Sequence, residues 1–409
     1  MKLIFEDRHS RTIKTKEEIR FFSFSSYHLI IITARAKSEK QLSRNSTDDE
    51  DLTVKIDKDK TFPQLRSNRL IDSPAALSGG RLHNLSKTIY FLTFLKGRDH
   101  KIILKTDKPT DTATFENLQI HVLDPTKKLT LEPKLQAEDG DRRPWITFVL
   151  DNLAIQSITP TLTYSRHDRD SDDVKITIDG KTQGNPLRTI KHFLWRYAGS
   201  LLPWVSPTKT QTEIFTINLP QDLHYIEFDA DRIPTLNKLV LDFGKTLPLP
   251  AGLPTVDNPK WTGDFYDDTD KMILARAIFG EARDELYPDK ARIAVGWSIR
   301  NRVEDSRWAN SYHEVIIKPE QYSAFNETDR NRPYIENPFW KDNDVDKTAW
   351  YNCFDIAGKV INGELKDPTS GANHYYDNSI STPYWATKET LALTIERSDN
   401  KAMLIFHKL

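Results

Sequence analysis

Apolar and polar positions follow two different patterns along the chain. Over the first 245 residues, short apolar or β-branched runs alternate with polar turns containing glycine or proline. Such runs are typical of strands with one buried face. The segments that fit are 27–34, 52–56, 89–94, 101–105, 145–150, 159–164, 174–178, 214–217 and 239–243. Many short strands separated by turn signals predict β-sandwiches.

The strand-rich region also repeats itself. Residues 51–57 (DLTVKID) match 173–179 (DVKITID), and four further matches follow in the same order at similar offsets. We therefore predict two tandem all-β jelly-roll sandwiches, residues 1–125 and 126–245, each of a size that suits a sandwich domain. The order of elements resembles the jelly-roll modules that accompany carbohydrate-active enzymes.

Three aromatic residues of the second copy, Trp195, Tyr197 and Trp204, are candidates for stacking on sugar rings. The resemblance to carbohydrate-binding modules implies that role. Alternatively, the same side chains belong to the core or cover a contact between domains. The β modules also remain candidates for spacers or for docking surfaces for other envelope proteins.

The pattern changes after residue 245. Residues 246–262 hold four prolines, which predicts an extended linker. A helical apolar period begins near Asp268, and further helices are predicted at 292–303, 313–317 and 347–363, the last ending at Asn362 and Gly363. Strands are predicted at 373–376, 391–396 and 402–407. Residues 263–409 therefore form an α+β, mainly helical domain.

Composition narrows the class of protein. The 58 basic and 59 acidic residues nearly balance, which argues against a nucleic-acid-binding protein. The one cysteine, Cys353, excludes an internal disulfide and a cysteine-based zinc site, and its apolar surroundings favour a buried, inert thiol. No His, Asp or Glu cluster has metal-ligand spacing. We predict neither a metal nor another cofactor.

The chain has no apolar run long enough for a signal peptide or a transmembrane helix, since the longest aliphatic run is 29–32. We expect no transmembrane segment and a monomer. If the protein acts outside the cytoplasm, export uses another route or a signal outside this sequence.

Glu281 is the leading candidate for chemistry. It follows Gly280 at the end of an apolar helical face, where neighbouring side chains can desolvate its carboxyl group. Desolvation raises a carboxyl pKa, as a general acid at neutral pH requires. Glu285 would share its face on a continuing helix. Taken alone, a glutamate beside arginines on a helix is more often part of a surface ion pair.

Further segments, taken in order, favour a catalytic role for Glu281 over a surface ion pair. They are GEAR at 280–283, NRV at 301–303, QYSA at 321–324, DPTSGANHYY at 367–376 and WA at 385–386. This succession resembles the SleB/CwlJ-type cell wall hydrolases, the spore cortex-lytic enzyme family, over roughly 140 residues. The sequence departs from the family pattern at Asp284, where the family has glycine, and in the terminal segment 394–406.

The resemblance implies a lysozyme-like fold and cleavage of the peptidoglycan glycan strand. It implies that Glu281 is the catalytic glutamate. Two further segments would line opposite walls of a glycan groove, and the predicted substrate-binding residues are Glu285, Gln321, Tyr322, Ser323, His374, Tyr375 and Tyr376.

Several functional outcomes stay open. Glu281 would protonate the glycosidic oxygen between N-acetylmuramic acid and N-acetylglucosamine. The family resemblance favours a lytic transglycosylase, in which Glu281 then acts as base and a 1,6-anhydro end forms. A second carboxylate would instead allow muramidase-type hydrolysis. A non-catalytic peptidoglycan-binding envelope protein is the rival class, while an amidase or peptidase would need a zinc triad or a Cys/His pair. The resemblance places the protein in the cell envelope, outside the cytoplasm, with glycan strands as its partner.

Overall fold

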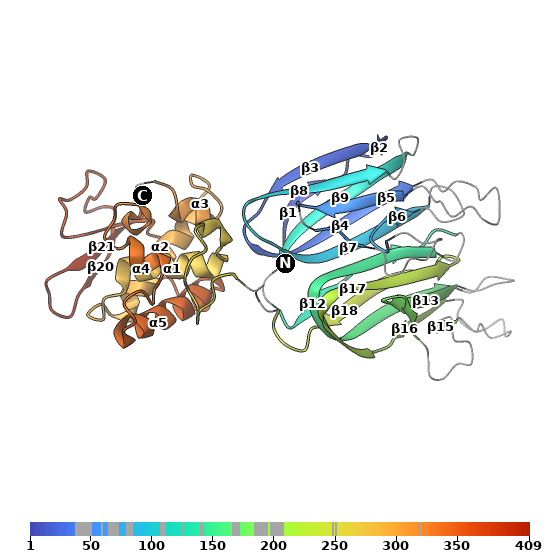
Figure 1. Cartoon of the computed structure of the whole chain (residues 1–409). Helices are drawn as coiled ribbons and strands as arrows, with labels where there is room; N and C mark the ends of the chain where they lie inside the picture. The colour runs from blue at the N-terminus through green and yellow to red at the C-terminus, as the bar shows by residue number, and fades with distance from the viewer. Residues whose placement is uncertain are drawn as a thin grey trace. The chain divides into compact units, whose positions relative to one another are not determined.

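The computed structural model describes residues 1–36, 51–58, 60–63, 73–78, 85–106, 112–123, 126–139, 143–165, 172–183, 195–196, 208–247, 249, 252–319 and 321–409. The chain divides into two compact units (Figure 1). The first comprises Met1–Leu95 and Asp99–Pro248, and the second comprises Lys96–Arg98 and Leu249–Leu409.

Throughout its described residues, the first unit is built from strands. They are β1 (Lys2–Asp7), β2 (Arg11–Ile13), β3 (Lys16–Phe22), β4 (Ser26–Ala36), β5 (Asp51–Ile56), β6 (Leu77–Ser78), β7 (Ser86–Leu95), β8 (Asp99–Thr106), β9 (Ala113–Leu123), β10 (Lys128–Leu131), β11 (Leu135–Gln136), β12 (Arg143–Ser165), β13 (Asp173–Ile178), β14 (Lys181–Thr182), β15 (Trp195–Arg196), β16 (Thr208–Thr212), β17 (Phe215–Asp231) and β18 (Thr235–Asp242). The predicted strands of this region are therefore confirmed, except that 145–150 and 159–164 belong to one continuous strand, β12.

One large sheet runs through both halves of this unit. Its main path is β1-β9-β4-β7-β12-β17-β13-β14 (Figure 1). The halves meet where β7 pairs with β12 in parallel, from Ile146 opposite Thr88 to Leu150 opposite Leu92. A smaller sheet, β3-β8-β5-β6, shares a buried apolar core with the first half of the large sheet. The two predicted sandwiches therefore share backbone hydrogen bonds.

The predicted repeat appears as a repeated local structure. Asp57 and Asp179 both have a left-handed backbone, with φ of 54° and 47°. Their carboxylates lie 2.9 and 2.8 Å from Nδ1 of His100 and His224. Each also accepts a hydrogen bond from the backbone N–H of the residue after that histidine. The matching sequence segments therefore make matching hydrogen bonds, while the jelly-roll topology and the module boundaries remain predictions.

The candidate sugar-stacking residues fall in a part of the chain that the structure barely describes. Tyr197 and Trp204 lie outside the described residues, and for Trp195 only the backbone, in β15, is described. The sugar-stacking role therefore stays a prediction.

The second unit contains five α-helices in its described residues, with two short 3-10 turns and a small sheet. The elements are η1 (Phe265–Asp267), α1 (Asp270–Ala282), α2 (Asp289–Glu304), α3 (Tyr312–Ile316), η2 (Ser323–Phe325), α4 (Arg332–Glu336), α5 (Asp344–Ile361), β19 (His374–Asp377), β20 (Leu391–Glu396) and β21 (Met403–His407). The mainly helical α+β class is confirmed. The sequence did not predict the five-residue helix α4.

Helix α1 is the centre of this unit. Its residues from Met272 to Gly280 are all buried, and it contacts α2, α3, α4 and α5. The Thr269 hydroxyl caps its start by accepting the Met272 N–H at 3.2 Å. A helix that is buried on every side is apolar around its whole circumference. Only side chains at its two ends can therefore reach a substrate.

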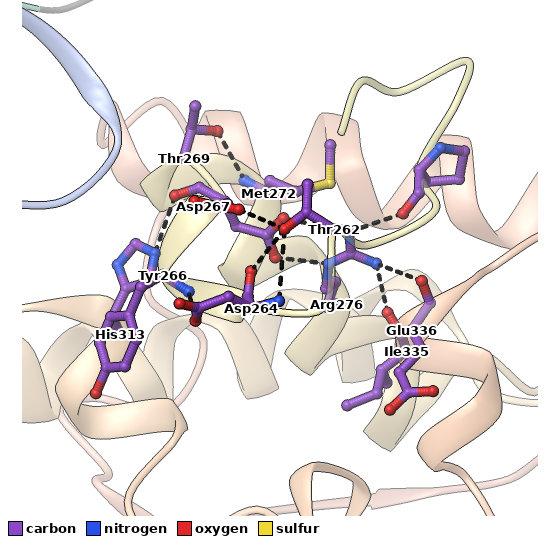
Figure 2. Close-up of polar contacts among 12 residues, drawn as sticks. Thr262, Asp264, Tyr266, Asp267, Thr269, Met272, Arg276, His313, Ile335 and Glu336 are labelled. Atoms are coloured by element: carbon purple, nitrogen blue, oxygen red, sulfur yellow. Dashed lines mark hydrogen bonds and ion pairs between the residues drawn. The ribbon is translucent and has the colours of Figure 1, made fainter. Parts of the chain in front are cut away.

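One charged side chain of α1 is fully buried. The Arg276 guanidinium donates to both carboxylate oxygens of Asp268, at 2.7 and 3.2 Å, and to the carbonyls of Pro259 and Ile335 (Figure 2). The backbone carbonyl of Asp268 in turn lies 3.0 Å from Nε2 of His313. Arg276 thus ties three segments to the central helix.

The proline-containing segment before η1 packs against this unit. Trp261 donates its backbone N–H to the carbonyl of Glu336 at 2.8 Å. The indole N–H of Trp350 donates to the Val256 carbonyl at 2.9 Å. Residues 252–262, which the sequence assigns to the linker, therefore have defined partners in the helical unit.

Candidate active site

Glu281 lies in the last turn of α1. The preceding residue, Gly280, packs so tightly that an added Cβ would lie 2.8 Å from Cβ of Ala324 and 3.0 Å from Cγ2 of Ile335. A glycine there lets the 321–325 segment and α4 reach the helix. The same approach brings the QYSA segment at 321–324 to the end of α1 that bears Glu281.

Glu281 is half-buried, and one of its two carboxylate oxygens lies away from solvent. Its Oε1 atom is buried and has no hydrogen-bond partner among the described residues. Burial raises the pKa of Glu281 to about 7, and the charges of Asp329 and Asp377 add to that rise, while a hydrogen bond with the Tyr375 side chain opposes it. A buried carboxyl group without a bonded cation favours its protonated form.

The arginines nearest in sequence bind elsewhere. Arg276 is taken up by Asp268. Arg283 donates to Oδ1 of Asn331 at 3.0 Å and its guanidinium lies 3.9 Å from the centre of the Tyr334 ring. Neither arginine therefore forms the surface ion pair with Glu281 that their closeness in sequence would suggest.

Two predicted tyrosines lie beside Glu281. The rings of Tyr322 and Tyr375 are 6.4 Å apart, centre to centre. Tyr322 is 2% exposed, and its hydroxyl is buried without a partner in the described part of the chain. Burial raises the pKa of Tyr322 to about 12, and both hydroxyls therefore stay protonated near neutral pH. The structure thus brings together Glu281, Tyr322 and Tyr375.

Arg302 joins the two segments that supply these tyrosines. It donates to Oε1 of Gln321 at 3.0 Å and to the backbone carbonyl of Asn373. Its guanidinium also lies 5.4 Å from the centre of the Tyr322 ring. The side-chain oxygen of Gln321 therefore binds Arg302, and Gln321 has a positioning role beside Tyr322.

The other predicted residues of β19 point away from Tyr375. Successive side chains of a strand alternate between its two faces. The Tyr375 ring packs 5.3 Å from buried Phe406, on the core side, whereas His374 and Tyr376 contact Trp385 at 5.1 and 5.8 Å. His374 and Tyr376 therefore do not share one wall with Tyr375.

Two further predicted residues lie apart from the buried cluster. Helix α1 ends at Ala282, so Glu285 falls in the following turn, where it is exposed. The expectation that Glu285 shares a helical face with Glu281 is therefore wrong, because the helix stops before the next turn is complete. Ser323 begins η2 and is also exposed.

The DPTSGA segment forms a loop around one carboxylate. Asp367 accepts hydrogen bonds from the N–H and hydroxyl of Thr369 and from the N–H of Gly371, all at 2.7–2.8 Å. Asn301 donates to the same carboxylate and to the Ala372 carbonyl. These bonds fix the chain direction entering β19, so the motif positions Tyr375.

The two departures from the family pattern meet in space. Asp284 pairs with Arg397 of the terminal segment at 2.8 Å and also accepts the Leu286 N–H at 2.9 Å. Arg397 pairs in addition with Asp399. This ion pair joins the turn after α1 to the β20–β21 hairpin. Asp284 and Arg397 are too far apart in the sequence for their spacing to predict the contact.

The sequence interpretation missed Asp329 and Asp377, whose charges act on Glu281. Asp377 follows Tyr375 by two residues, so strand alternation could have placed it on the Glu281 side. Asp329 lies in an irregular segment after η2, for which no periodic signal exists.

Metal and thiol chemistry receive no support from the described residues. Among them, no group of three His, Cys, Asp or Glu side chains could hold a metal ion. Cys353 is fully buried, and burial raises the pKa of its thiol to about 12, which matches the predicted inert thiol. None of the described helices is long and apolar enough to cross a membrane.

The C-terminal unit is similar to one family of proteins. Residues 287–398 match the family model described as cell wall hydrolase, so the C-terminal unit carries a cell wall hydrolase domain. The match begins just after Glu281 and includes Gln321, Tyr322 and Tyr375. The resemblance identified from the sequence motifs is therefore confirmed for this unit.

Curated relatives carry one name, spore cortex-lytic enzyme. The protein of Halalkalibacterium halodurans is 28% identical over 120 residues, which are 29% of this chain and 31% of that protein. The protein of Oceanobacillus iheyensis is 24% identical over 137 residues, 33% of this chain and 41% of that protein. The chain thus spans 31% to 41% of the length of these two relatives.

A solved structure overlaps the same part of the chain. The catalytic domain of the Bacillus cereus SleB protein is 22% identical and covers 39% of this chain and 94% of that chain, with a TM-score of 0.25. At that TM-score, the likeness supports no further conclusion.

Proposed function

We propose that this protein cleaves the glycan strand of peptidoglycan between N-acetylmuramic acid and N-acetylglucosamine, with Glu281 as the general acid. The observation that carries the proposal is the half-buried Glu281, whose Oε1 atom is buried without a partner in the described residues and whose pKa is raised to about 7 beside two protonated tyrosines. A family match to cell wall hydrolases and relatives named spore cortex-lytic enzymes support the substrate. The site of action is then the cell envelope, outside the cytoplasm.

The electrostatics of Glu281 suit a proton donor that must later accept a proton. With a pKa of about 7, the carboxyl group is partly protonated near neutral pH. It gives its proton to the glycosidic oxygen as that bond breaks. The resulting carboxylate then takes a proton from the muramyl 6-hydroxyl, whose oxygen bonds to the anomeric carbon. The products are a 1,6-anhydro end and a free 4-hydroxyl, which is the lytic transglycosylase outcome.

Two nearby carboxylates support the alternative of hydrolysis. Asp329 and Asp377 both act electrostatically on Glu281, and Asp377 is exposed at the end of β19. Hydrolysis by a pair of carboxylates needs one to donate a proton and the other to activate water or attack carbon. Asp377 is the second acid in that version, because its strand position gives it the same face as Tyr375.

Product analysis tests the reaction. Purified peptidoglycan is digested with the protein, and the soluble muropeptides are analysed by mass spectrometry. Products lighter by one water than ordinary reducing-end muropeptides support the transglycosylase version, and full-mass reducing ends support hydrolysis. Glu281→Gln should lower the rate by about 10²- to 10⁴-fold.

Glu285→Gln is the matched control, since it makes the same chemical change four residues away at an exposed position. Equal loss in both variants would contradict the assignment of Glu281. Sedimentation of the wild-type protein with insoluble peptidoglycan, without release of soluble fragments, would instead support the non-catalytic binding protein.

The strand-rich unit has a supporting role in this proposal. We infer that residues 1–125 and 126–245 are jelly-roll modules that hold the enzyme at its glycan substrate. Retention of residues 1–245 on peptide-free glycan strands supports this role, and no retention there favours spacers or surfaces for other envelope proteins.

A further inference from the structure

The outer face of the small sheet carries a cluster of aromatic rings. Tyr376 stacks on His407, with ring centres 5.8 Å apart, and the Trp385 ring lies 5.8 Å from Tyr376 and 5.6 Å from His407. His374 lies 5.1 Å from Trp385 and 5.6 Å from Trp308. We call these five residues the outer aromatic cluster.

Part of this cluster is open to solvent. Trp385, Tyr376 and His374 are half-buried. Tyr384, which directly precedes Trp385 in the β19–β20 connection, is 96% exposed. Ile380 of the same connection is 57% exposed. Exposed large apolar side chains gathered on one segment mark an interaction surface.

The cluster also contains an unused polar group. His407 is 3% exposed, and its Nε2 atom has no hydrogen-bond partner among the described residues. Its Nδ1 atom lies 2.8 Å from the Thr390 hydroxyl, so only Nε2 is left for another partner. A buried nitrogen between two aromatic rings is costly unless a bound group satisfies it.

The cluster is uncharged near neutral pH. Burial, together with the charges of Arg302 and Arg307, lowers the pKa of His374 to about 4. Burial likewise lowers the pKa of His407. A neutral surface of ring faces with a few hydrogen-bonding edges fits an uncharged pyranose, whose C–H face stacks on an aromatic ring.

From these observations, we propose that the outer aromatic cluster binds an N-acetylhexosamine unit of the glycan strand, at a site separate from Glu281. This inference rests on the proposed function. Strand β19 lies at the edge of the three-stranded sheet, and its adjacent residues Tyr375 and Tyr376 face opposite sides. A polysaccharide passing around that edge meets the Glu281 side and the cluster in succession.

A stem peptide is the competing ligand. Its carboxylates would seek cations, and these gather at the Trp308 end, where Arg302 and Lys318 lie 4.2 and 5.5 Å from the ring centre. At the other end, Tyr384 is 96% exposed, and the indole of the neighbouring Trp385 carries no charge. The cluster therefore favours the sugar over the peptide.

Binding of chitohexaose, an uncharged β-1,4-linked N-acetylglucosamine oligomer, tests the site by calorimetry. The full chain carries Glu281→Gln so that the ligand stays intact. Adding Tyr384→Ala or Trp385→Ala should raise the Kd about five- to tenfold. Trp340→Ala, which removes a 54% exposed tryptophan outside the cluster, is the control and should leave the Kd unchanged. Tyr384 is so exposed that its loss cannot unfold the domain.

The outcomes separate the two proposals. Peptidoglycan cleavage by the wild-type chain, with equal Kd values in the Tyr384, Trp385 and Trp340 variants, overturns the sugar site and leaves the enzyme intact. Weaker binding of a synthetic stem peptide, with chitohexaose binding unchanged, overturns it in favour of the peptide. Weaker chitohexaose binding in the Tyr384 and Trp385 variants supports the site even if the wild-type chain proves unable to cleave.

Discussion

The Tyr375 side chain lies beside the carboxyl group of Glu281 and lowers its pKa. The two residues come from different elements, Tyr375 from the edge strand β19 and Glu281 from the end of the central helix α1. This influence opposes the effect of burial on Glu281, since a nearby hydroxyl favours the ionised carboxylate. The pKa of the candidate acid therefore depends on how the β-sheet is seated against the helix.

Removing the Tyr375 hydroxyl tests that dependence. In Tyr375→Phe the hydroxyl that lowers the pKa of Glu281 is lost, so that pKa rises further. A general acid with a higher pKa stays protonated to higher pH, and the alkaline limb of the pH–rate profile should move up. Tyr376→Phe, whose ring faces the other side of β19, is the matched control. An alkaline limb that moves down would contradict this effect of the Tyr375 hydroxyl on Glu281.

Glu281→Gln should change stability in a pH-dependent way. The pKa of Glu281 is raised from 4.5 to about 7, so between these values the folded protein holds a proton that the unfolded chain releases. That contribution to stability is fully present below pH 4.5 and is lost as pH rises through 7. At pH 8 the wild-type protein therefore bears a cost of up to about 3 kcal/mol that glutamine does not.

Urea unfolding at pH 4 and pH 8 checks this expectation. The free energy of unfolding of Glu281→Gln, relative to wild type, should increase between the two values. Glu285→Gln should show no such change, because Glu285 is exposed. A pH-independent difference for Glu281→Gln would mean that its carboxyl group is solvated.

The buried ion pair of the central helix should matter far more than surface pairs. Arg276→Met leaves the fully buried Asp268 carboxylate without its cation (Figure 2). An uncompensated buried charge costs about 3–5 kcal/mol, measured as the loss in free energy of unfolding. The control is Lys359→Met, which removes an exposed helical pair with Asp355 and should cost under about 1 kcal/mol. Comparable losses in both variants would show that Asp268 is protonated or hydrated.

Local sequence signals were enough for much of this fold. The helix stop at Asn362 and Gly363 was predicted from residue type, and Gly363 does adopt a left-handed φ of 71°. The internal repeat was visible because Asp57 and Asp179 serve the same turn beside a histidine. Such features depend on residues that are close in sequence, or on a pattern that the chain repeats.

The rest depended on contacts that sequence spacing does not encode. The parallel pairing of β7 with β12 merges the two predicted sandwiches into one sheet, and nothing in either strand's alternation specifies that partner. The pairing of Asp284 with Arg397 likewise joins distant segments. The opposite directions of Tyr375 and Tyr376 followed from strand alternation, which the motif-based interpretation of the site did not apply.

Gly280 offers a test of how the candidate acid is positioned. Gly280→Ala would place a Cβ 2.8 Å from Cβ of Ala324 and 3.0 Å from Ile335. Overpacking of this kind costs about 1–3 kcal/mol of stability and should push the Tyr322 segment away from Glu281. Activity on peptidoglycan should therefore fall together with the free energy of unfolding.

The second substitution Ala324→Gly supplies the control, because it removes the atom that the new methyl group meets first. The double variant Gly280→Ala/Ala324→Gly should recover part of both the activity and the stability lost in the single variant, which a double-mutant cycle measures. If stability returns and activity does not, Gly280 positions Glu281 through the last turn of α1 and not through the contact with Ala324. If neither returns, Ile335 and α4 set the limit, and the contact with Ala324 is not what positions the site.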